Sequence, residues 1–163
     1  MANLIDPNEL MFKKFQPKTQ NRFILLVDGI PSFMIKKAAR PSVKFGTITL
    51  DHINTKRKIQ GAATWEDMDI VLYDPIVPSA AQAAMEWVRL GYESVTGRAG
   101  YADLYKKDLT IQILGPIGDK VEEWEIKGAM ITAVTGGDLD WANGDSVMEL
   151  SISLAYDFAI LHY

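Results

Sequence analysis

Cysteine is absent from this chain of 163 residues, and histidine occurs only twice. The lack of cysteine excludes disulfides, thiolate zinc sites and a cysteine nucleophile. His52 falls in an extended segment and His162 is the penultimate residue, whereas a catalytic triad needs a histidine held between a nucleophile and an acid. These absences predict a protein that is not an enzyme and that binds no cofactor and no metal.

Positive charge and long apolar runs are also scarce. Lysine and arginine together number 17 against 21 acidic residues, which gives a net charge of -4. This balance argues against a dedicated nucleic-acid binder, because affinity for a phosphate backbone comes mainly from Lys and Arg. No segment approaches the ~18 apolar residues of a membrane helix, and residues 1–15 lack the apolar core of a signal peptide. We therefore expect a cytoplasmic protein with no membrane partner.

What the sequence does have is β-strand periodicity, most clearly in residues 147–158. A period of two places alternate side chains on opposite faces of a strand. One face is predicted to be buried and comprises Met148, Leu150, Ile152, Leu154, Tyr156 and Phe158. The other face is small and polar, and its members include Glu149, Ser151 and Ser153.

Similar patterns predict further strands and one helix. The additional strands are expected over residues 22–28, 65–73, 107–115 and 121–134. An Ala-rich segment follows Ser79, a favourable N-cap residue, and predicts a helix that ends near Gly91. The residues expected to face the core from this helix are Ala81, Ala84, Met85 and Val88.

These elements predict a single, mainly β domain over residues 1–163. Its fold is expected to be two packed antiparallel sheets, in a sandwich or barrel-like arrangement, with one helix and an extended β-hairpin arm. Residues 1–20 are predicted to form a separate N-terminal arm.

The hairpin arm is predicted over residues 43–61. Its residues alternate as strands do but include too few large apolar side chains to form a core of their own. Such an arm usually packs on something else, and for a soluble chain we expect another subunit. The predicted inter-subunit contacts are Val43, Phe45, Thr47, Ile48, Leu50, Lys56, Arg57 and Lys58.

Two motifs resemble a phosphate-binding loop and a calcium-binding loop, but neither has the full pattern. Residues 97–100 are glycine-rich and basic, but they follow a helix and lack the Lys-Ser/Thr pair of a phosphate loop, so we expect a flexible loop. Asp138, Asp140 and Glu149 match three positions of a calcium loop, but Asn143 stands where that loop needs glycine. We instead expect a hairpin turn here, with positive φ angles at Gly136, Gly137, Asn143 and Gly144.

The order of several short patterns resembles the tail tube proteins of contractile-tailed bacteriophages. The resemblance covers residues 20–160. The segments that carry it are RFILLVDGI (22–30), Ala39-Arg40-Pro41, Lys58-Ile59-Gln60-Gly61, TWEDMDIVLYD (64–74), the helix with Trp87, Tyr105-Lys106-Lys107-Asp108, Glu125-Ile126-Lys127-Gly128 and Leu139-Asp140-Trp141.

The resemblance implies a structural protein of the virion tail, assembled in the host cytoplasm. In such tails the subunits form hexameric rings that stack into a hollow tube inside a sheath, and DNA passes through an acidic lumen without specific binding. The implied partners are further copies of the chain, the sheath protein, and the baseplate and tail terminator proteins. The residues expected to face the lumen are Glu123, Glu125, Glu149, Ser151 and Ser153.

Other functions remain open at this point. The same fold serves the tubes of type VI secretion, phage-derived bacteriocins and contractile injection systems. A small-ligand-binding β-barrel with an apolar interior is a second possibility, and a polysaccharide-acting enzyme that uses the acidic strands is a third. The polar face of residues 149–153 could also meet the sheath instead of the lumen.

Overall fold

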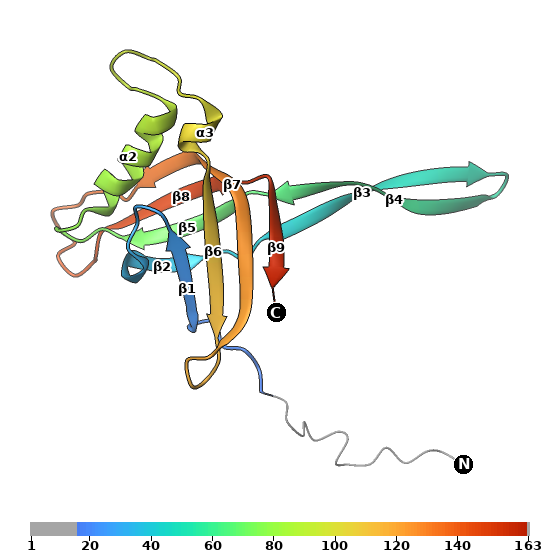
Figure 1. Cartoon of the computed structure of the whole chain (residues 1–163), viewed down its shortest axis with the longest axis horizontal. Helices are drawn as coiled ribbons and strands as arrows, with labels where there is room; N and C mark the ends of the chain where they lie inside the picture. Colours follow the sequence, from blue (N-terminus) through green and yellow to red (C-terminus); the bar gives the residue numbers. More distant parts are fainter. Residues whose placement is uncertain (1–15, 163) are drawn as a thin grey trace.

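The fold is described from a computed structural model, for residues 16–162 (Figure 1). Most of the predicted N-terminal arm, residues 1–15, lies outside the described residues. The helices are η1 (Ser32–Met34), α2 (Ala80–Gly91) and α3 (Ala102–Tyr105). The strands are β1 (Phe23–Val27), β2 (Ile35–Ala38), β3 (Ser42–His52), β4 (Thr55–Glu66), β5 (Met68–Tyr73), β6 (Lys107–Leu114), β7 (Lys120–Gly136), β8 (Glu149–Ala155) and β9 (Phe158–His162).

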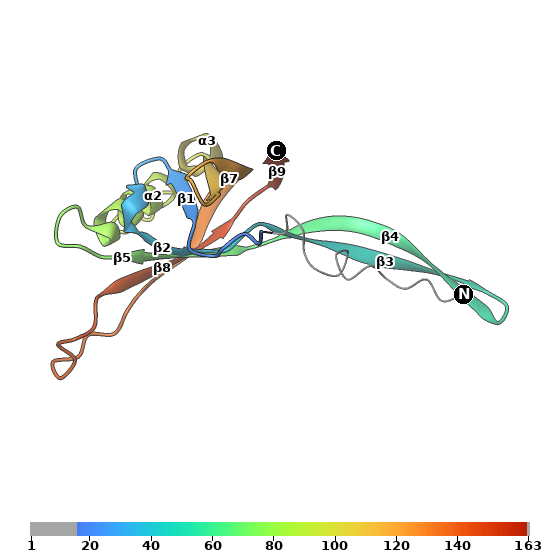
Figure 2. The same cartoon turned by 90° about the horizontal axis from the view of Figure 1, so that it is seen from below.

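Two antiparallel sheets form the body of the domain, and β7 belongs to both. In sheet A, the first half of β7 lies between β6 and β9, and β1 pairs with β6. In sheet B, the second half of β7 pairs with β8, followed by β5 and β2. The strands of the two sheets run at a steep angle to each other in Figure 1, and Figure 2 shows them as two layers. The predicted two-sheet, mainly β fold is confirmed.

Alternating residues of both sheets meet in one core. Sheet A contributes Leu25, Leu109, Ile111 and Ile126, and sheet B contributes Met68, Ile70, Leu72, Leu150, Ile152 and Leu154. Because these side chains come from facing layers, the solvent-facing sides of the two sheets point in opposite directions (Figure 2).

Helix α2 covers part of the core, and its beginning was predicted correctly. The Ser79 side chain accepts a hydrogen bond from the backbone N–H of Gln82, as an N-cap does. Of the four residues predicted to face the core, Ala84 is buried, but the helix is rotated from the predicted orientation, since Ala80 and Trp87 are also buried while Met85 is exposed. Trp87 sets this orientation, since its ring is buried and its Nε1 donates to the Tyr105 carbonyl at 2.6 Å.

The apolar run over 147–158 forms two strands instead of the single strand predicted. Of the residues predicted to be buried, Leu150, Ile152, Leu154 and Tyr156 are buried, whereas Met148 and Phe158 are exposed. The reason is that β8 begins at Glu149 and that the chain leaves sheet B after Ala155 and continues as β9 in sheet A. Asp157 marks the break, because its backbone N–H donates to the Lys127 carbonyl and its carboxylate pairs with Lys106.

The glycines with positive φ also differ from the prediction. Among the described residues they are Gly29, Gly97, Gly118 and Gly128, so the positive φ angles predicted for Gly136, Gly137, Asn143 and Gly144 are not found. Gly128 lies in β7, where the strand passes from sheet A to sheet B.

Candidate assembly surfaces

The β3–β4 hairpin is a long arm that projects from the sandwich (Figure 1). Its base is held by Tyr156, whose hydroxyl accepts from the Ser42 N–H at 3.2 Å and whose ring lies 5.9 Å from that of Trp65. Beside it, Glu66 accepts from Ser42 and pairs with Lys44. The hydrogen bond from Lys44 lowers the pKa of Glu66 and raises that of Lys44. The arm therefore leaves the domain in a defined direction.

Beyond its base the arm is exposed. Every residue of β3 is exposed, and so are the first six residues of β4. This arm contains all the predicted inter-subunit contacts: Val43, Phe45, Thr47, Ile48, Leu50, Lys56, Arg57 and Lys58. The structure confirms the predicted hairpin, although β3 and β4 extend beyond residues 43–61, and the role of these residues as contacts stays a proposal.

A bulge divides the arm into two halves. The pairing shifts between Phe45–Ala63 and Thr47–Gln60, so that Gly46 lies opposite Gly61 and Ala62. On the domain side, Val43 and Phe45 share a face with their partners on β4. On the distal side, the opposite face is apolar, with Ile48 paired to Ile59 and Leu50 to Arg57. We call this the distal apolar face.

The distal arm ends in an apolar side chain. Ile53 is the first residue of the two-residue loop, and its side chain is 90% exposed. Its φ of 51° lies in the left-handed region, which is unusual for a β-branched residue. The tip of the arm therefore exposes a large apolar side chain on a strained backbone.

Sheet B ends on both sides in a strand that has no second partner. Among the described residues, β2 pairs only with β5, and residues 130–136 of β7 pair only with β8. These two edges lie on opposite sides of sheet B. Exposed edges are templates for pairing with another chain, and closing them into a ring is one way to cover them.

The predicted lumen residues of β8 share one solvent-facing surface. Ser151 and Ser153 lie opposite Val71 and Asp69 of β5, and the Ser153 hydroxyl donates to Asp69 at 2.6 Å. Glu149 pairs with Lys36, and the hydrogen bond between them raises the pKa of Lys36. The surface is therefore small and polar, but a lysine neutralises one of its acids.

The other two predicted lumen residues lie elsewhere. Glu123 and Glu125 are on the solvent-facing side of sheet A, in register with His162 and Ile160 of β9. Hydrogen bonds from Lys120 to Glu123 and from Lys127 to Glu125 are the main causes that lower the pKa values of these carboxyls. The structure does not bring the five residues onto one face, since the outer sides of sheets A and B point in opposite directions.

Within residues 16–162, no group of three or more His, Asp or Glu side chains is placed to hold a metal ion. No helix in the same part of the chain is long and apolar enough to span a membrane. A hollow of about 320 Å³ lies between α2, α3 and β7, lined by Trp87, Tyr92 and Tyr105 among others, and it is outside the sandwich core.

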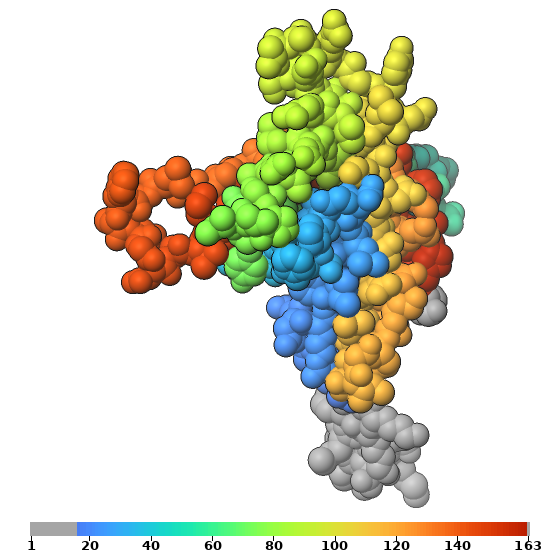
Figure 3. Space-filling model, turned by 60° about the vertical axis from the view of Figure 1, so that its left-hand side comes forward, coloured from blue at the N-terminus to red at the C-terminus, as the bar shows by residue number. Residues whose placement is uncertain are grey.

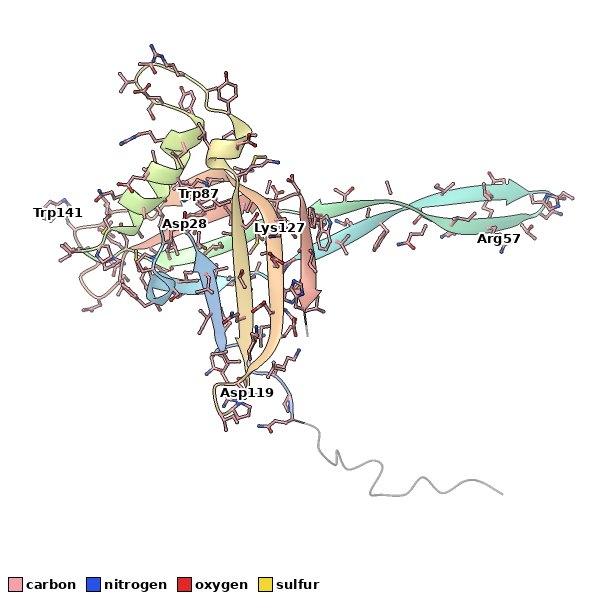
Figure 4. The ribbon with its side chains drawn as sticks, viewed as in Figure 1. Asp28, Arg57, Trp87, Asp119, Lys127 and Trp141 are labelled. Atoms are coloured by element: carbon pink, nitrogen blue, oxygen red, sulfur yellow. The ribbon has the colours of Figure 1, made fainter. Side chains whose placement is uncertain are left out.

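An exposed apolar segment that was not predicted from the sequence lies between β7 and β8. The loop between β7 and β8, residues 137–148, carries Leu139, Trp141, Val147 and Met148, all of them exposed. Trp141 stands fully in solvent at the opposite end of the molecule from Arg57 (Figure 4). Tryptophan is rarely left in water without a reason, so a Trp in an Asp/Gly-rich turn was the available signal.

Open sheet edges, a long unsupported arm and an exposed apolar loop are features typical of a structural subunit that assembles with other chains. The T4-like virus tail tube protein gp19 family matches residues 19–158. The chain belongs to this family.

Individual relatives are more distant. The chain is 25% identical over 131 residues to the tail tube protein gp19 of Enterobacteria phage T4, with 78% of this chain and 79% of that protein covered. Its fold is similar to a chain of the anti-feeding prophage cap, with a TM-score of 0.75, 19% identity and 99% of both chains covered. It is also similar to a sheath/tube terminator of the PVC extracellular contractile injection system, with a TM-score of 0.73, 18% identity, and 93% and 100% covered.

Proposed function

We propose that this chain is the structural subunit of the inner tail tube of a contractile particle. Copies associate head to tail into rings, taken to be hexameric, and the rings stack into a tube that serves as the conduit for DNA. The sheath, baseplate and tail terminator proteins are its partners, and the assembled protein is part of the virion tail. The chain has no catalytic role and binds no cofactor.

The observation that carries this proposal is the arm. A hairpin of 11 and 12 residues per strand contributes nothing to the core beyond Trp65 at its base, so its apolar side chains are covered only when another chain is present. The free edges of sheet B, at β2 and at residues 130–136, give adjacent copies a second way to pair.

The surface of β8 supports the conduit part of the proposal. Glu149, Ser151 and Ser153 form a surface of short polar side chains, and both edges of their sheet are free to pair with adjacent copies. The net charge of -4 gives the subunit little attraction for phosphate. A genome would slide past such a wall instead of binding to it.

The ligand-binding barrel is less well supported. The space between sheets A and B is filled by the core side chains, and the hollow beside α2 lies outside that space. The acidic side chains also favour a structural role over glycoside hydrolysis, since Glu123, Glu125 and Glu149 each form an ion pair with a lysine.

Assembly of the purified chain tests the proposal. We expect negative-stain electron micrographs to show rings or tubes, and size-exclusion chromatography over a concentration series to show an increasing assembled fraction. Deletion of residues 46–57 should leave a folded monomer, because the core does not include them. Wild-type protein that stays monomeric throughout the series, or a deletion variant that forms normal tubes, would contradict the proposal.

A further inference from the structure

Two exposed apolar parts of the molecule lie at its opposite ends. One is the distal apolar face of the arm, where Ile48, Leu50 and Ile59 are each about half exposed. The other is the β7–β8 loop, where Leu139 is 80% and Trp141 106% exposed. Figure 4 shows Arg57 on the arm and Trp141 on the loop at the two ends of the long axis.

The β7–β8 loop is folded on itself in a way that presents Trp141. The Asp140 carboxylate accepts from the Ala142 N–H at 2.9 Å, and the Ser146 hydroxyl donates to the Asn143 side chain at 3.0 Å. Gly137 closes the base by donating to the Glu149 carbonyl. Figure 3 shows the loop standing clear of the body. A pre-ordered apolar anchor costs less to bury in an interface than a mobile one.

The two ends also carry opposite charge. The loop contains Asp138, Asp140 and Asp145 and has no Lys or Arg, whereas residues 51–58 of the arm contain three basic residues and one acid. Arg57 is on the distal apolar face, because it pairs with Leu50 across the hairpin. In the part of the chain that the structure describes, neither Arg57 nor any of these aspartates belongs to an ion pair.

We propose that the distal apolar face of one copy docks on the β7–β8 loop of another copy. Ile48, Leu50 and Ile59 would cover Trp141 and Leu139, and Arg57 would face the loop aspartates. This inference rests on the proposed tube assembly and names the surface that receives the arm. Because the two surfaces differ and lie at opposite ends, the contact is heterologous and propagates from copy to copy.

The arm supplies a matched pair of charge reversals for the test. Arg57 is on the docking face, whereas Lys58 pairs with Thr49 on the opposite face. Arg57→Glu should raise the critical concentration for assembly about tenfold or more, since it places an acid against acids in a desolvated contact. Lys58→Glu makes the same change in charge and should have a much smaller effect. Asp138→Lys with Asp145→Lys should restore assembly of the Arg57→Glu variant; Asp140 is left intact because it orders the loop.

Because the chain has no cysteine, single thiols can map the contact directly. A mixture of the Leu50→Cys and Ala142→Cys variants should form a disulfide-linked dimer under mild oxidation, and a mixture of Lys58→Cys with Ala142→Cys should not; Ala142 orders the loop only through its backbone N–H. If the wild type and Arg57→Glu assemble equally well and no Leu50–Ala142 cross-link forms, the docking proposal is wrong while the proposed tube function stands. A wild type that never assembles and never cross-links overturns both proposals.

Discussion

Gly61 faces Gly46 across the bulge of the arm so closely that a Cβ on Gly61 would lie 3.1 Å from the carbonyl carbon and oxygen of Gly46. The reverse is not true, since a Cβ on Gly46 would meet nothing nearer than 3.7 Å. The bulge is also where the apolar side of the arm changes from the face of Val43 and Phe45 to the face of Ile48 and Leu50. The glycine at position 61 therefore sets how the distal half is presented.

The asymmetry predicts different results for two alanine substitutions. Gly61→Ala should widen the bulge, misdirect the distal half and impair assembly, while Gly46→Ala should assemble nearly as the wild type does. Both variants should unfold within about 0.5 kcal/mol of the wild type, because neither residue belongs to the core. Chemical denaturation and electron microscopy measure the two properties separately. Equal assembly of both variants would contradict this account of the bulge.

The faces of the two sheets predict different labelling in intact tubes. If the β8 surface lines the lumen, the thiol of Ser151→Cys should react slowly with a reagent too bulky to enter the tube and at a normal rate in dissociated subunits. Thr110→Cys is the control on the opposite surface, since Thr110 lies in register with Glu125 in sheet A. Rapid labelling of Ser151→Cys in intact tubes would place its face outside. Rapid labelling of Thr110→Cys in intact tubes would show that Glu123 and Glu125 do not face the lumen.

The sequence was most informative where local patterns and burial agree. Ser79 predicted the start of α2 correctly because an N-cap acts within one turn, and the period of two predicted the buried residues of β8. The orientation of α2 was missed because it depends on the partner that Trp87 finds in Tyr105, a distant residue. The change of sheet at Asp157 likewise depends on Lys106 and Lys127.

The candidate assembly surfaces were predictable only in part, because they too depend on contacts between residues that are distant in the sequence. Alternation without enough apolar residues identified the arm, but it could not show that the bulge moves the apolar side from one face to the other. The acidic residues proposed for the lumen were grouped by charge, and the fold separates Glu123 and Glu125 from Glu149 because β7 bends between the two sheets.

The bend of β7 predicts that a substitution at Gly128 strongly lowers the stability of the domain. Its φ is 66°, and a Cβ there would lie 2.1 Å from Oδ2 of Asp157. The carboxylate cannot move away without loosening its pair with Lys106. Gly128→Ala should therefore lower the free energy of unfolding by about 1–3 kcal/mol, as measured by chemical denaturation.

Two other glycines separate the two causes proposed for Gly128, which are its positive φ and the contact of an added Cβ with Asp157. Gly118 also has positive φ but open space around it, so Gly118→Ala reports the backbone cost alone. Gly144 has neither constraint, and Gly144→Ala should leave stability unchanged. A Gly144→Ala variant as unstable as Gly128→Ala would show that the explanation from φ and contact is wrong.

Glu122 predicts how stability depends on pH. Its side chain is 10% exposed on sheet A, where it accepts hydrogen bonds from Lys18 and from the Trp124 indole. The bond from Lys18 is the largest cause that holds the pKa of Glu122 below its ordinary value of 4.5, against the opposing effect of burial. A lowered pKa in the folded state means that the contribution of Glu122 to stability is present above the unfolded pKa and is lost as the pH falls through the folded pKa.

Glu122→Gln should flatten the decrease of unfolding free energy between about pH 6 and about pH 3, and Lys18→Met should flatten it too. Denaturation curves for Glu122→Gln that run parallel to the wild type over this range would show that Glu122 does not contribute to the acid dependence.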